Sequence, residues 1–154
     1  MVTLALEAIA QKPEAAGISF VHDFPGLVKT QIGRDLSGVG GTLLKGLFIA
    51  IAPFVAVSNQ ESGERHLFVS TSARFAARGG EGVADGLVLE KGGKVARGTD
   101  GKEGSGVYST VENQESAGAK VEHLLAGFRK EGLVEKVWGL IEEDFVRITG
   151  KASL

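Results

Sequence analysis

The chain has 154 residues, 43% of them hydrophobic, and a formal net charge of -2 at pH 7. This length and apolar content are sufficient for one domain with a buried core. The small charge gives no basic surface for nucleic acid, so no nucleic-acid partner is expected. The absence of cysteine excludes disulfides, thiol catalysis and cysteine metal sites, and it is compatible with a cytoplasmic protein. The three histidines form no helical pair of metal ligands, and the sequence therefore predicts no metal site.

The first part of the chain predicts a helix followed by a buried strand. Apolar residues recur at helical spacing over residues 2–11, and Pro13 ends that helix. The strand covers residues 18–24 and is apolar or small on both faces, which is typical of a parallel strand inside a sheet. A Pro-Gly turn at Pro25 ends the strand, and a short helix or turn is expected over residues 27–36.

The longest apolar run of the chain lies at residues 43–57. It is shorter than the ~20 residues that a membrane-spanning helix needs, so we expect no membrane insertion. We expect a helix over residues 42–56 that is buried or forms a lid. The glycine-rich segment 38–41 before it predicts a flexible hinge, because it lacks the Gly-Lys-Ser/Thr ending of a phosphate-binding loop.

A helix and a glycine-rich excursion follow. Ser58 and Glu61 form the Ser-x-x-Glu pattern of a capping box, which predicts the start of a helix over residues 61–72. The chain is then rich in glycine from residue 79 to residue 106. Within that segment, residues 87–97 predict a small hairpin that turns at a Gly-Gly pair.

The remainder predicts one strand and two helices. Residues 107–112 are β-branched and aromatic enough for a second strand. Val121, Leu124, Leu125 and Phe128 then recur at helical spacing. Gly132 is expected to end that helix and to separate it from a last, similarly spaced one.

Residues 21–30, Val-His-Asp-Phe-Pro-Gly-Leu-Val-Lys-Thr, resemble the late strand and nicotinamide-side loop of short-chain dehydrogenases/reductases of the fungal biosynthetic type. Segments 61–68, 104–108 and 135–138 are similar to later parts of such enzymes. The resemblance implies an α/β fold, namely a truncated Rossmann-like remnant made of the carboxyl-terminal half. It further implies a small, partly parallel sheet, about five or six helices, and a single domain over residues 1–154.

The sequence also departs from this family. The family's Pro-Gly-x-Val-x-Thr loop contacts the nicotinamide and phosphates, which would map onto Pro25, Gly26, Val28 and Thr30. The family's glycine-rich dinucleotide loop and its Tyr-x-x-x-Lys pair, however, are both absent from these 154 residues. The single tyrosine, Tyr108, has no lysine at the required spacing. We therefore expect no NAD or NADP cofactor and no hydride transfer by this chain alone.

The expected pocket lies between the end of the first strand, the apolar helix and the second strand, because open α/β sheets bind ligands at the carboxyl ends of their strands. His22 and Asp23 are neighbours in a strand and point to opposite faces, so at most one of them faces the pocket. The alternative for His22 is a core histidine bonded to the backbone. The catalytic candidates are His22, Lys29, Thr30 and Tyr108, and the apolar substrate-binding walls are Phe24, Leu47, Phe48, Ile51 and Phe54.

A fold without its cofactor leaves an apolar cleft that can hold a flexible substrate in a reactive conformation. The resemblance therefore implies a non-redox cyclase or isomerase, pericyclases included, that acts on a hydrophobic intermediate of fungal natural-product biosynthesis. The alternatives are a non-catalytic binding or scaffold partner of a full-length enzyme, and an inactive fragment of an NADPH-dependent reductase. An apolar strand without its neighbour also needs cover, so a homodimer or larger assembly is expected.

Overall fold

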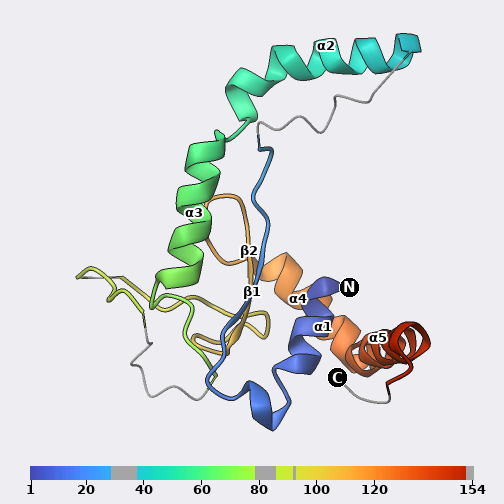
Figure 1. The fold of residues 1–154 in the computed structure, drawn as a ribbon. Helices are drawn as coiled ribbons and strands as arrows, with labels where there is room; N and C mark the ends of the chain where they lie inside the picture. The colour runs from blue at the N-terminus through green and yellow to red at the C-terminus, as the bar shows by residue number, and fades with distance from the viewer. Residues whose placement is uncertain (29–37, 79–85, 92, 152–154) are drawn as a thin grey trace.

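The computed structural model describes residues 1–28, 38–78, 86–91 and 93–151 (Figure 1). In chain order the elements are α1 (Val2–Ile9), the 3-10 helix η1 (Pro13–Ala15), β1 (Phe20–Asp23), α2 (Gly38–Val55), α3 (Asn59–Thr71), β2 (Val107–Thr110), α4 (Ala119–Lys130) and α5 (Leu133–Thr149). The described residues thus form a mixed α/β fold with five α-helices and a two-stranded parallel sheet. This confirms the predicted fold class, a partial Rossmann-like arrangement. In the described part of the chain, no helix is long and apolar enough to cross a membrane.

The sheet joins two strands that lie far apart in the sequence. β1 and β2 are parallel, and their register pairs Phe20 with Val107 and Asp23 with Thr110. The backbone N–H of Phe24 continues the ladder by donating to the Thr110 carbonyl at 3.3 Å. Because the strands are parallel, Asp23 and Thr110 end at the same edge of the sheet, and the side chains at this edge are brought together.

Two apolar clusters hold the body of the molecule. The first joins α1, α4 and α5 through the buried side chains Leu4, Leu125, Val134 and Val137. The second lies against the sheet and contains Phe75, Ala96 and Tyr108. Of the predicted stripe on α4, Leu125 is buried and Phe128 packs against the cluster, whereas Val121 and Leu124 are exposed. Gly132 separates α4 from α5 in the predicted way, with a left-handed backbone (φ +67°).

α2 differs from the other helices because it extends away from the sheet (Figure 1). Its apolar side chains Leu43, Leu47 and Ile49 are exposed, so its described residues do not form the buried helix that was one of the two predictions. The predicted hinge was wrong in its position, since α2 already begins at Gly38 and includes the glycines of segment 38–41.

Two predictions about the connecting segments have opposite outcomes. Ser58 caps α3 as predicted, because its Oγ accepts a hydrogen bond from the backbone N–H of Glu61 at 3.1 Å. The hairpin over residues 87–97 was wrong: its two ends bridge to other segments, Leu87 to Ser72 and residue 97 to residue 103. A tight turn does form near the predicted place, where the residue 93 N–H donates to the residue 90 carbonyl at 2.7 Å. The predicted turn pair includes Gly92, which lies outside the described residues.

Candidate functional site

The carboxyl edge of the sheet carries a buried carboxylate. Asp23 is the last residue of β1, and its Oδ1 accepts a hydrogen bond of 2.8 Å from the hydroxyl of Thr110, the last residue of β2. The Asp23 side chain is 12% exposed. No hydrogen bond of normal geometry reaches its second oxygen, Oδ2, from the described residues. One half of the carboxylate is thus held in place, and the other half is available.

His66 on α3 faces this available oxygen. Its Nε2 lies 3.2 Å from Asp23 Oδ2, and its Nδ1 lies 2.6 Å from the carbonyl oxygen of Ser62. Both neighbours are acceptors, whereas a neutral imidazole carries only one N–H. With the N–H on Nδ1 donating to the Ser62 carbonyl, Nε2 is the nitrogen that can take up a proton beside Asp23 Oδ2. Because the imidazole is 54% exposed, the ring lies close to solvent and to any ligand at the edge.

Contacts of the loops beyond the strands fix α3 at this edge. Arg65 donates to the carbonyl of Glu112, just after β2, and forms an ion pair with Glu61 at 2.6 Å. The loop after β1 packs against the same residue, Glu112. Gly26 has φ +72°, and a Cβ at this position would lie 2.8 Å from the Cβ of Glu112. Only glycine therefore fits this approach without a shift of the neighbouring chain.

His22, the predicted catalytic histidine, faces the other way. Its Nδ1 lies 2.7 Å from Oγ1 of Thr3 on α1, so His22 and Asp23 point to opposite faces, as their neighbouring places in a strand predict. The structure therefore brings His22 to α1, and it brings Asp23 to the edge with His66.

Tyr108 is fully buried beneath the sheet rather than exposed at its edge. Its hydroxyl donates to the carbonyl of Ala76 at 2.6 Å, and its ring packs edge-on against Phe75 with the ring centroids 5.4 Å apart. Burial raises the pKa of the Tyr108 hydroxyl above its ordinary value. This geometry makes Tyr108 a structural hydroxyl in the core.

Three of the other predicted site residues can be placed among the described part of the chain. Phe24, Leu47 and Ile51 have exposed side chains, the last two on the projecting α2. Lys29 and Thr30 lie outside the described residues, as do the side chains of Phe48 and Phe54. The substrate-binding roles of these positions stay predictions. Among the residues that the structure describes, no group of three or more potential ligands could hold a metal ion.

His66 and Thr110 were not among the residues predicted for the site. The signal for Asp23 was present, because it lies at the carboxyl end of a predicted parallel strand. No comparable signal exists for the other two, since their contact with Asp23 depends on the β1–β2 register and on the packing of α3.

Comparison with known proteins finds fungal oxidoreductases. The chain is 30% identical over 154 residues to oxidoreductase andH of Emericella variicolor, covering 99% of this chain and 44% of that protein. It is 34% identical over 139 residues to oxidoreductase AN1596 of Emericella nidulans, covering 90% of this chain and 40% of the relative. The NmrA-like family domain-containing oxidoreductase notO of Aspergillus sp. is 32% identical over 146 residues, with coverage of 94% and 37%.

The chain therefore spans less than half the length of these curated relatives. No family model matches the sequence, and no solved structure is significantly similar. The chain is distantly similar to fungal oxidoreductases, which supports the fungal and oxidoreductase parts of the resemblance described above.

Proposed function

We propose that this chain binds a small, mainly apolar molecule at the carboxyl edge of the β1–β2 pair and moves a proton on it without hydride transfer. It would act as a cofactor-independent isomerase or cyclase on a hydrophobic intermediate of fungal natural-product biosynthesis. The observation that carries this proposal is the contact of 3.2 Å between Asp23 Oδ2 and the exposed imidazole of His66.

The two side chains suit different roles in proton transfer. His66 is exposed and is the group that would contact the substrate, whereas Asp23 is nearly buried and fixed by Thr110. Asp23 is therefore a positioning residue, and its carboxylate stabilises the imidazolium form of His66. Carboxylate–imidazole pairs of this kind are well suited to general acid–base catalysis.

The reaction needs no oxidant or reductant. The neutral imidazole carries its N–H on Nδ1, against the Ser62 carbonyl, so Nε2 is unprotonated. Nε2 takes a proton from the α-carbon of a β,γ-unsaturated ketone, and the electron pair moves into the carbonyl to give a dienolate. The imidazolium then returns the proton to the γ-carbon, which yields the conjugated ketone. The same dienolate is a nucleophile for ring closure, so isomerase and cyclase activity share this first step.

Three exposed apolar residues lie near the pair in the sequence. Phe24 follows Asp23 directly, Leu67 follows His66 directly, and Leu27 lies on the loop after β1; all three side chains are exposed. An apolar substrate covering them would remove water from the Asp23–His66 pair and strengthen its electrostatic interaction with the reacting atoms.

The proposal is tested by the isomerisation of cyclohex-3-enone to its conjugated isomer, followed by absorbance with no nicotinamide added. We expect the wild-type chain to accelerate this reaction and His66→Gln to lower the rate by about 100-fold, the usual contribution of a general acid–base group. His123→Gln is the matched control, because His123 is an exposed histidine on α4. Equal rates for the wild type and His66→Gln would contradict the proposal.

A second candidate function is favoured by the comparisons. The three relatives are named oxidoreductases, so this chain would form part of an oxidoreductase. The resemblance of residues 21–30 to a nicotinamide-side loop makes NADPH the cofactor to test, which a further segment would need to bind. Calorimetric titration with NADPH separates the two functions. The isomerase proposal expects no saturable heat, because the chain has no glycine-rich dinucleotide loop. Saturable micromolar binding, with oxidation of NADPH by a ketone, would support the oxidoreductase.

A further inference from the structure

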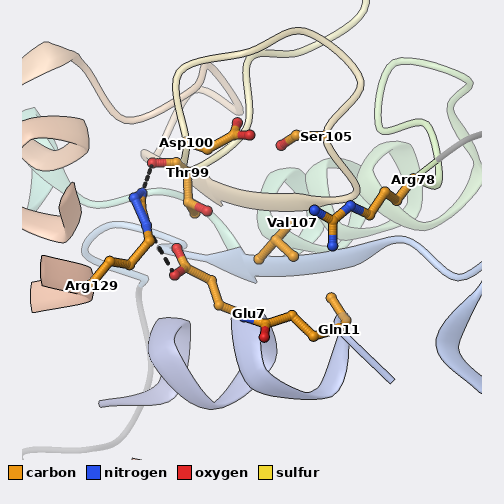
Figure 2. A pocket seen from close by; sticks show the side chains of 9 residues that line it. Glu7, Gln11, Arg78, Thr99, Asp100, Ser105, Val107 and Arg129 are labelled. Atoms are coloured by element: carbon orange, nitrogen blue, oxygen red, sulfur yellow. Dashed lines mark hydrogen bonds and ion pairs between the residues drawn. The ribbon is translucent and has the colours of Figure 1, made fainter. Parts of the chain in front are cut away.

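A pocket of about 140 Å³ lies at the other end of β2, away from Asp23. It is formed by α1, α4 and the loop that leads into β2 (Figure 2). Val107, the first residue of β2, lines it, whereas Asp23 pairs with the last residue of that strand. The pocket is thus separate from the proposed proton-transfer site and shares no residue with it.

The pocket contains a buried carboxylate with an unpaired oxygen. Glu7 on α1 is only 6% exposed, and its Oε2 lies 3.3 Å from Nε of Arg129. Its other oxygen, Oε1, receives no hydrogen bond from the described residues. A buried charged oxygen without a partner is costly, so this position favours a donor from water or from a ligand.

The arginines of the pocket differ in how they are held. Arg129 is fixed, because it contacts Glu7 and also donates to the carbonyl of Thr99 at 2.7 Å. Arg78 is exposed and has no hydrogen bond or ion pair with other described residues. The backbone of Arg78 closes against Gly106, where a Cβ would lie 2.7 Å from the Arg78 Cβ and where φ is +87°. This close approach holds Arg78 at the wall, with its guanidinium available.

The charges of the lining point to a ligand that carries both signs. Figure 2 shows Glu7 rising from α1 toward Arg129, with Asp100 across the pocket and Arg78 to one side. Arg129 compensates Glu7, which leaves Asp100 and Arg78 as opposite charges on the lining. The volume of about 140 Å³ exceeds the ~10–15 Å³ of such space that one water molecule needs, so the pocket has room for a molecule of several heavy atoms.

We propose that this pocket binds a small zwitterion of the amino-acid type. Its ammonium group donates to Glu7 Oε1 and is further favoured by the carboxylate of Asp100, and its carboxylate pairs with the guanidinium of Arg78. The Glu7 carboxylate then receives a charged donor, and the Arg78 guanidinium receives a planar anion.

The test is a titration of the isotope-labelled chain by NMR with L-alanine, propionate and ethylamine. Propionate lacks the ammonium group and ethylamine lacks the carboxylate. We expect saturable amide shifts in α1 and in residues 98–107 with alanine, and at least about tenfold weaker binding of the other two probes. Binding of propionate as tight as that of alanine would overturn the ammonium contact.

Two variants separate binding from folding. Glu7→Gln and Arg78→Gln should each weaken alanine binding by about tenfold or more. Arg78 is exposed, so Arg78→Gln is expected to fold even if Glu7→Gln does not. The control is Arg147→Gln on α5, whose arginine pairs with Asp144 outside the pocket, and it should bind alanine normally. An unchanged affinity in Arg78→Gln, or no saturable shift with alanine, would overturn the proposal.

Discussion

Two buried carboxylates, Asp23 and Glu7, lie at opposite ends of the sheet, and their partners differ. Each has one oxygen held in place and one that receives no hydrogen bond from the described residues. Oδ2 of Asp23 faces an imidazole, which has a nitrogen that can accept a proton, whereas Glu7 is paired with a guanidinium, which has only donors. The first environment suits proton transfer and the second suits binding. The imidazole and the guanidinium, rather than the carboxylates themselves, distinguish the proposed proton-transfer site from the proposed binding site.

The largest expected effect concerns the packing that supports the Glu7 end. Leu125 is buried among Leu4, Val134 and Val137, so Leu125→Ala should lower the free energy of unfolding by about 2–4 kcal/mol. Its neighbour Leu124 is 53% exposed, and Leu124→Ala is the matched control, expected to cost well below about 1 kcal/mol. Denaturant unfolding measures both. Equal losses in the two variants would show that the α1–α4–α5 cluster is not the core described above.

The comparison of the carboxylates predicts different effects of matched amide substitutions. Asp23→Asn should lower the isomerisation rate by about 100-fold with little change in KM, because the imidazolium loses its stabilising charge. Glu7→Gln that keeps the circular dichroism spectrum of the wild type should leave that rate within about twofold, since Glu7 lies outside the proton-transfer site. Steady-state kinetics on cyclohex-3-enone measures both. A loss of similar size in the two variants would point to a general effect on folding, which circular dichroism would detect.

The pKa of Tyr108 predicts how stability depends on alkaline pH. Below the ordinary tyrosine pKa of 10.0, the folded and unfolded chains both keep the phenol proton, so the contribution of Tyr108 is fully present. Above it, the unfolded chain releases the proton while burial retains it in the folded chain. Stability is therefore lost as the pH rises toward and through the raised pKa. Because Tyr108 is the single tyrosine, the ultraviolet absorbance of phenolate reports it directly. A midpoint at or below pH 10.0 with the fold intact would contradict this burial.

The smallest expected effect on unfolding concerns α2. Its apolar side chains are exposed, unlike the carboxylates at the two ends of the sheet. Ile49 is 72% exposed, so Ile49→Ser should change the free energy of unfolding of the monomer by less than about 0.5 kcal/mol. The sequence predicts a homodimer that covers apolar surface, and sedimentation should give a mass above the 16.1 kDa of one chain. If α2 contributes to that contact, Ile49→Ser shifts the distribution toward the monomer. A wild-type chain that sediments at 16.1 kDa would contradict the homodimer.

The helices and strands of the body were predictable, because local patterns determine them. The Ser58 cap and the left-handed Gly132 follow from short motifs. The hinge before α2 was not predicted correctly, since glycine lowers helix stability by only ~1 kcal/mol and neighbouring residues can compensate for that cost. The Asp23–His66 contact was not predictable either. It joins β1 to α3 across 43 residues, and only the tertiary packing of α3 against the sheet edge brings the two side chains together.

The most direct test of the central claim is deuterium incorporation from D2O into cyclohexanone by the wild-type chain without nicotinamide. Reversible removal of the α-proton by the Asp23–His66 pair predicts that the α-carbon gains deuterium faster than in buffer. The rate of deuterium incorporation should fall by about 100-fold in Asp23→Asn, and His123→Gln should keep the wild-type rate. Incorporation at the buffer rate, or at an equal rate in the wild type and Asp23→Asn, would contradict the account.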